Sequence, residues 1–105
     1  MTIAVIYHWK ITPGKETTFE KMWYQSTKTI YEHWGSFGSS LHKTKDGTYL
    51  AYARWPDHET WQKMIQEYTA EEAIETFWEE HVTEIEQPVV LDLLEDYLYK
   101  TSGNT

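Results

Sequence analysis

Cysteine is absent from this chain of 105 residues, which excludes disulfide bonds, thiolate metal ligands and a cysteine nucleophile. Basic residues are scarce, because nine Lys and Arg stand against seventeen Asp and Glu and give a formal net charge of −8. Such a charge disfavours a nucleic-acid backbone or an anionic membrane surface as a partner. Long apolar runs are missing too, since residues 3–11 are too few and too polar to span a bilayer. We expect a cytoplasmic protein without nucleic-acid or membrane partners.

Signatures of several common sites are also missing. The five histidines show no His-x-x-x-His or His-x-Glu spacing, so we predict no metal site. The sequence contains no Ser-His-Asp pattern, glycine-rich phosphate loop or kinase signature. No repeat or linker divides the chain, and its length suits one modest core. We expect a single domain over residues 1–100 and a flexible tail over residues 101–105.

Aromatic residues, by contrast, are abundant: they make up 16% of the chain, with six Trp and eight Tyr. We expect some of them to pack the core and others to line a cavity or an interface. Every second residue from Ile3 to Ile11 is apolar, which predicts a strand with one strongly apolar face. From Lys15 the apolar period becomes helical, which predicts a helix that ends near Trp34.

The pair Asp46-Gly47 predicts a β-hairpin, because a tight two-residue turn needs positive φ at both central residues. The hairpin strands would cover about 38–45 and 48–55. A two-residue turn would place Thr44 opposite Tyr49, His42 opposite Ala51 and Leu41 opposite Tyr52.

The second half of the chain reads as two helices and a closing strand. Asp57 is a suitable N-cap for a short amphipathic helix, and Thr69 with Glu72 resembles a capping box for another. Gln87-Pro88 would end the helical region, and residues 89–99 would form the last strand. The resulting order, β-α-β-β-α-β, predicts a ferredoxin-like α+β fold with a four-stranded antiparallel sheet. Both sheet faces carry apolar residues, which predicts a homodimer with two sheets packed face to face.

Three stretches carry a resemblance to a known family: Pro13-Gly14-Lys15-Glu16 with Phe19 after it, the hairpin from Gly38-Ser39 to Thr48-Tyr49, and the strand end Ala53–Asp57. Over residues 3–99 the chain resembles the antibiotic biosynthesis monooxygenase-like family. The resemblance implies a dimeric α+β barrel with a ligand pocket between helices and sheet in each subunit. Members include cofactor-independent oxygenases of polycyclic phenols, heme-degrading enzymes and proteins of unassigned activity. Fold transfers across such a family more firmly than reaction.

The leading hypothesis is a cofactor-independent monooxygenase acting on an aromatic small molecule. By the alternation of the hairpin, His42, Tyr49 and Trp55 share one face, and the resemblance adds Tyr7 from the first strand. An imidazole is a competent base near neutral pH, so His42 would take a proton from an acidic phenol. The anion would reduce dioxygen directly, while the hydroxyls of Tyr7 and Tyr49 hold it. The alternative is that His42 and Tyr49 only pack near the hairpin tip.

Two further hypotheses stay open. The heme-degrading branch of the family implies that Trp55 lines the pocket and that His81, four residues after Phe77, binds heme iron through its imidazole. That branch has an asparagine where this chain has Tyr7, so the amide donor is missing. The third hypothesis is a non-catalytic, dimeric ligand-binding module. The candidate substrate-binding residues are Trp9, Trp23, Trp55, Trp78 and His81.

Overall fold

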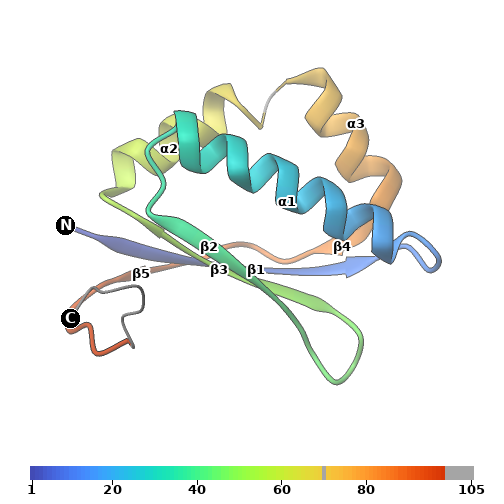
Figure 1. Ribbon diagram of the computed structural model, residues 1–105, viewed down its shortest axis with the longest axis horizontal. Coiled ribbons are helices and arrows are strands. Elements are labelled where there is room, and N and C mark those ends of the chain that lie inside the picture. The colour runs from blue at the N-terminus through green and yellow to red at the C-terminus, as the bar shows by residue number, and fades with distance from the viewer. Residues whose placement is uncertain (70, 99–105) are drawn as a thin grey trace.

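A computed structural model describes residues 1–69 and 71–98 of the chain. The elements follow the order β1 (Ile3–Ile11), α1 (Glu16–His33), β2 (Gly38–Lys43), β3 (Tyr49–Trp55), α2 (His58–Glu67), α3 (Glu72–His81), β4 (Val82–Ile85) and β5 (Val89–Asp92). The three helices cover one face of the sheet, as Figure 1 shows. The tail predicted over residues 101–105 lies outside the described residues.

The sheet confirms the predicted ferredoxin-like α+β fold. Its strands are antiparallel and follow the order β2-β3-β1-β4, and β5 pairs with β1 as well. The predicted closing strand over residues 89–99 begins at Val89 as expected, but β5 already ends at Asp92, and residue 99 lies outside the described residues. The additional strand β4 was not predicted, and the two short strands pair with different halves of β1. Pro88 lies between them, and its missing amide hydrogen removes a ladder bond at that point. The predicted end of the helical region at Gln87-Pro88 is also wrong, because α3 ends at His81 and β4 follows at once.

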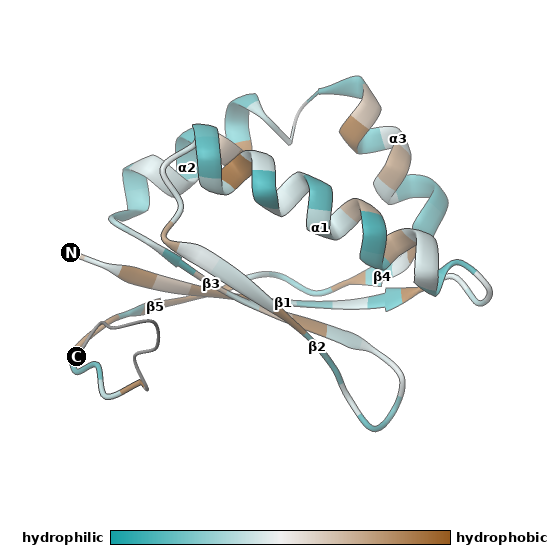
Figure 2. Ribbon diagram, viewed as in Figure 1, coloured by the Kyte–Doolittle hydropathy of each residue, from teal (hydrophilic) through white to brown (hydrophobic). Residues whose placement is uncertain are grey.

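The inner face of the sheet, which faces the helices, carries the alternating residues predicted for β1. Ile3, Val5 and Trp9 are buried there and pack with inner residues of β3. Figure 2 shows the hydrophobic stretches along β1. The opposite set, which consists of Ala4, Ile6, His8 and Lys10, belongs to what we call the outer face of the sheet.

The β2–β3 hairpin departs from its predicted register by one residue. Its loop is three residues long, because the Thr44 amide donates to the Thr48 carbonyl (2.9 Å) and the Gly47 amide to the Thr44 carbonyl (3.0 Å). Gly47 has a φ of 84°, the left-handed glycine that closes a common three-residue hairpin loop. His42 consequently lies opposite Leu50, not Ala51. A one-residue slip moves every β2 side chain to the other face, so His42 lies on the outer face.

The predicted N-cap of α2 is confirmed, and the predicted capping box of α3 is wrong. The Asp57 carboxylate accepts hydrogen bonds from the Thr60 amide (2.7 Å) and the Thr60 hydroxyl (2.8 Å), which lower the pKa of Asp57. The Thr69 hydroxyl donates back to the Ile65 carbonyl at the end of α2, and the N-cap position of α3 is Glu71, without a side-chain cap. Thr69 therefore stabilises the end of α2 instead of the start of α3.

The core consists of two clusters along the inner face. One joins the start of β1 and the end of β3 to α2, and the other places Phe19 of α1 against Trp9 and Tyr49. In the part of the chain that the structure describes, no helix is long and apolar enough to cross a membrane. Residues of both clusters line the candidate site.

Candidate functional site

A cavity of about 290 Å³ lies between the helices and the inner face of the sheet. Tyr7 and Trp9 reach it from β1, Ala53 and Trp55 from β3, and Trp78 from α3. Ala53 is small and lines the cavity, and a larger side chain at this position would fill part of the space. None of its lining residues is Asp, Glu, Lys, Arg or His, so the lining carries no charge at neutral pH.

Aromatic rings form one wall of the cavity. The rings of Tyr7 and Trp9 are stacked, with centroids 5.5 Å apart and an interplanar angle of 4°. Trp78 stacks on Trp9 with centroids also 5.5 Å apart. Stacked rings offer flat apolar surface, which suits a planar aromatic ligand. The predicted binding residues Trp9, Trp55 and Trp78 therefore come together here.

The hydroxyl of Tyr7 is the best-defined polar group of the cavity. It accepts a hydrogen bond from the indole N–H of Trp61 over 2.8 Å. Burial raises the pKa of Tyr7, and the bond from Trp61 offsets part of this rise. The hydroxyl is consequently protonated at neutral pH, and its hydrogen has no acceptor among the residues that the structure describes.

Most of the other polar groups of the lining are satisfied within the protein. The Ser26 and Tyr68 hydroxyls lie 3.1 Å apart, and the Ser36 hydroxyl accepts from the Gly38 amide (2.9 Å). The buried indole N–H of Trp9, by contrast, has no hydrogen-bond partner within the described ranges. The wall formed by Tyr7 and Trp9 thus carries two hydrogens that have no acceptor among the described residues.

The predicted group of Tyr7, His42 and Tyr49 does not come together. His42 is exposed on the outer face, where its Nε2 lies 2.9 Å from the Ser40 hydroxyl. Tyr49 is buried on the inner face, but its hydroxyl donates to the Glu20 carboxylate of α1, and the residue does not line the cavity. Burial and the bond to Glu20 raise the pKa of Tyr49 to about 12. Of the three predicted catalytic residues, Tyr7 alone lines the cavity.

Trp23 and His81 also lie away from the cavity lining. Trp23 packs against the cluster around Phe19. The His81 Nδ1 donates to the Phe77 carbonyl over 3.0 Å, and its ring stacks on that of Phe77 with centroids 4.3 Å apart. The Phe-x-x-x-His spacing therefore serves a contact within α3. An axial histidine must face the bound ring, so these residues do not fit a heme in the cavity.

Trp61 lies in the amphipathic helix predicted after Asp57, and its bond to the cavity residue Tyr7 was not predicted. Its indole N–H had to find a partner, because a buried Trp is usually hydrogen-bonded. Tyr7, which carries a hydroxyl on the apolar face of β1, was the signal that could have identified that partner. The packing that places Tyr7 beneath α2 cannot be predicted from the sequence.

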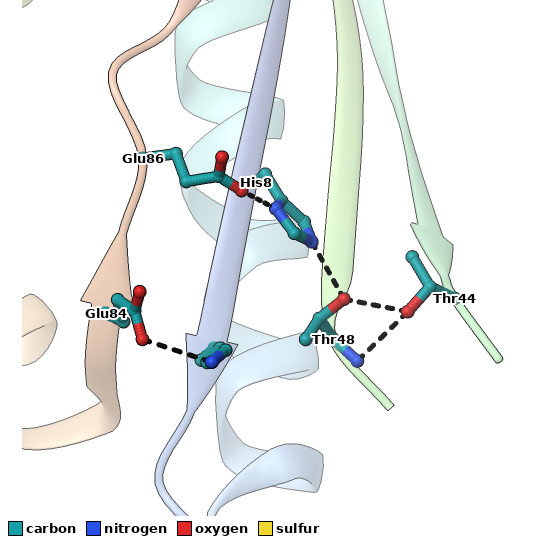
Figure 3. Close-up of polar contacts among 6 residues, drawn as sticks. His8, Thr44, Thr48, Glu84 and Glu86 are labelled. Carbon is teal, nitrogen blue, oxygen red and sulfur yellow. Dashed lines mark hydrogen bonds and ion pairs between the residues drawn. The ribbon is translucent and has the colours of Figure 1, made fainter. Parts of the chain in front are cut away.

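The outer face carries its own polar network, drawn in Figure 3. The His8 Nδ1 contacts the Glu86 carboxylate, and its Nε2 lies 2.8 Å from the Thr48 hydroxyl, which in turn lies 2.7 Å from that of Thr44. Beside it, Lys10 and Glu84 form an ion pair of 3.2 Å. The network connects β1 to the hairpin and to the segment after β4.

No known family profile and no curated protein matches the chain. Solved structures do. SnoaB from Streptomyces nogalater, described as a cofactor-independent oxygenase, is 15% identical, with a TM-score of 0.72 over 90% of this chain and 95% of that one. Rv0793 from Mycobacterium tuberculosis is also 15% identical, with a TM-score of 0.67 over 91% and 98%. A protein from Chloroflexus aurantiacus J-10-fl, provisionally named an antibiotic biosynthesis monooxygenase, is 7% identical, with a TM-score of 0.71 over 92% and 97%.

At these identities the likeness is one of fold, and it extends over nearly the whole length of each protein. The resemblance carried by the Pro13–Glu16 turn and the Trp55 corner is thereby confirmed at that level. This chain has the fold of the antibiotic biosynthesis monooxygenase-like proteins.

Proposed function

We propose that the protein is a cofactor-independent monooxygenase that acts on a planar aromatic substrate of the anthrone type. The observation that carries the proposal is the uncharged cavity with stacked aromatic walls, lined by Tyr7, whose hydroxyl hydrogen has no acceptor among the described residues. The likeness in fold to SnoaB, a cofactor-independent oxygenase, supports the reaction class.

The size of the cavity favours a compact ligand. Its volume of about 290 Å³ stands at the lower end of the range of about 300–1,000 Å³ typical of ligand pockets. Two or three fused rings suit that space better than a larger ring system. Because the lining carries no charged side chain, a negative charge on the ligand is stabilised only where a donor contacts it.

The reaction would convert a methylene group into a carbonyl. The ionised substrate gives an electron to dioxygen, and the two radicals combine into a peroxide on that carbon. Cleavage of the O–O bond with loss of the second hydrogen leaves the ketone, so R₂CH₂ and O₂ give R₂C=O and H₂O. Tyr7 would donate to the substrate oxygen that holds the negative charge. Since no carboxylate or imidazole lines the cavity, we propose that the substrate enters already ionised, not that His42 takes its proton.

Replacing Tyr7 with phenylalanine tests this role. Oxygen consumption with anthrone as substrate is expected to fall about 10²-fold, the effect of losing one donor to a developing oxyanion. His33→Ala, at the exposed end of α1, is the control and should keep the full rate. Oxygen consumption that never exceeds the protein-free rate would contradict the proposal.

One observation favours the non-catalytic ligand-binding module as a second candidate: the cavity lining contains no residue that could act as a base at neutral pH. The same oxygen measurement separates the two functions. A protein that binds anthraquinone tightly but leaves oxygen uptake at background is a binding module.

We further propose that the outer face binds a second copy of this chain. Two ion pairs lie on this face, Lys10 with Glu84 and Arg54 with Asp96, and the His8 ring contacts the Glu86 carboxylate there. Two chains of net charge −8 repel one another unless their contact surface is locally neutral. Leu91, 44% exposed beside Ala4, adds apolar surface, and Leu94 after it is 83% exposed.

Leu91→Glu is expected to shift the protein from dimer to monomer, because each interface would then hold two unpaired charges. The dimer dissociation constant, measured by sedimentation velocity, should rise at least tenfold. The matched control is Tyr31→Glu, which adds the same charge to an exposed position on α1. A wild-type protein that stays monomeric at high concentration, or a Leu91→Glu protein that dimerises normally, would contradict this assignment of the interface.

A further inference from the structure

We infer that Trp61 is a positioning residue that restricts Tyr7 to donating a hydrogen bond, so that the cavity selects ligands with an acceptor oxygen. The inference rests on the proposed binding of an aromatic ligand, and it does not depend on oxygenation. It assigns a role in recognition to a residue outside the cavity lining.

The geometry around the Tyr7 hydroxyl carries the inference. A phenolic oxygen has one hydrogen to give and accepts at its lone pairs. The indole N–H of Trp61 occupies the accepting side over 2.8 Å, and indole nitrogen can only donate. The Tyr7 hydrogen must then point elsewhere. It finds no other acceptor among the residues that the structure describes, while the residue itself lines the cavity.

Both partners of this bond are held firmly. Trp61 is 7% exposed and packs in the cluster that joins α2 to β1 and β3. It lies in the first turn of α2, whose start is fixed by the Asp57 cap on Thr60. The Tyr7 ring is held on its other side by stacking on Trp9. The direction of the hydroxyl is therefore set before any ligand arrives, which lowers the entropic cost of binding.

A consequence for specificity follows. A ligand that presents a carbonyl or an ionised oxygen to Tyr7 gains a hydrogen bond and leaves the Trp61 bond intact. A ligand that presents a donor instead must share the oxygen with the N–H of Trp61, and it leaves the Tyr7 hydrogen unpaired. A hydrocarbon of the same shape leaves the Tyr7 hydrogen unpaired in an apolar cavity. Ring systems with an acceptor oxygen should thus bind more tightly than their hydrocarbon counterparts.

The experiment compares anthraquinone, which carries acceptor oxygens, with anthracene, which carries none. The ratio of their dissociation constants is measured for the wild type, Tyr7→Phe, Trp61→Phe and the double variant. Tyr7→Phe should reduce the preference for anthraquinone about fivefold, the worth of one neutral hydrogen bond. Trp61→Phe should reduce it about threefold, and it should have no further effect in the Tyr7→Phe background. Trp34→Phe, which makes the same chemical change at the end of α1, should leave the preference unchanged.

A spectroscopic readout separates positioning from simple packing. The carbonyl stretch of bound anthraquinone, recorded by difference infrared spectroscopy, should shift to lower frequency in the wild type. The shift should vanish in Tyr7→Phe and weaken in Trp61→Phe. Failure of anthraquinone to bind would contradict both the proposed function and this inference. Binding with the same ratio and the same carbonyl frequency in Trp61→Phe would overturn the inference alone.

Discussion

Replacing Phe19 with alanine is expected to destabilise the protein by about 3–5 kcal/mol, the cost of removing a fully buried phenylalanine. Phe19 is 0% exposed and is the centre of the second core cluster. Its ring contacts those of Trp9, Tyr49 and Trp78, with centroids between 5.2 and 5.9 Å apart. The alanine would leave a cavity that these large rings cannot fill without leaving their own contacts. Urea unfolding followed by tryptophan fluorescence measures the loss.

The effect of Phe19→Ala should exceed that of any exposed residue on the same helix. Tyr24→Ala is the matched control, because Tyr24 is 64% exposed on α1 and its loss should cost no more than about 0.5 kcal/mol. Since Phe19 holds α1 against the sheet between Trp9 and Tyr49, the variant should also lose helical content at lower urea concentration. A free energy of unfolding within 1 kcal/mol of the wild type would show that this cluster contributes little to the stability of the protein.

Strong local signals allowed the fold to be predicted from the sequence. The alternation from Ile3 to Ile11 predicted β1, and Asp57 before an amphipathic pattern predicted the start of α2. Each of these signals needs only neighbouring residues. The order of strands followed because few topologies connect such a series of elements.

The candidate site was harder to predict, because it depends on the hairpin register. Asp46-Gly47 is compatible with a two-residue turn and with a three-residue loop, and the sequence does not decide between them. The observed three-residue loop moves His42 to the outer face. The one extra loop residue thus removed His42, the predicted base, from the site. Tyr7, Trp9 and Trp55 remain at the site because they lie on the inner face of β1 and β3, which packs against the helices.

Contacts between distant elements account for the other errors. Thr69 and Glu72 have the spacing of a capping box, yet the Thr69 hydroxyl bonds back into α2. The strand β4 has only four residues, of which Thr83 and Glu84 are polar, so its pattern is too short to detect. Its pairing with the end of β1 is what makes it a strand. The Trp61–Tyr7 bond joins residues 54 positions apart and has no local signal.

Substituting phenylalanine for Ala53 is expected to abolish ligand binding while the fold persists. Ala53 is buried and lines the cavity, so a benzyl side chain at this position projects into the open space. It would occupy the volume that a ring system needs, and the dissociation constant for anthraquinone should rise at least a hundredfold, a loss of about 2.7 kcal/mol. Because the side chain enters existing space, the free energy of unfolding should change by less than about 1.5 kcal/mol.

Ala51→Phe is the matched control, one step along the same face of β3. Ala51 is 1% exposed, opposes Tyr7 and does not line the cavity, so the added ring has no space to enter. Overpacking of this kind costs about 1–3 kcal/mol. The two variants should therefore separate binding from stability: Ala53→Phe loses ligand affinity, and Ala51→Phe loses stability. Anthraquinone affinity that survives in Ala53→Phe would place the binding site outside this cavity, because no ligand of three fused rings could share the remaining volume with the new side chain.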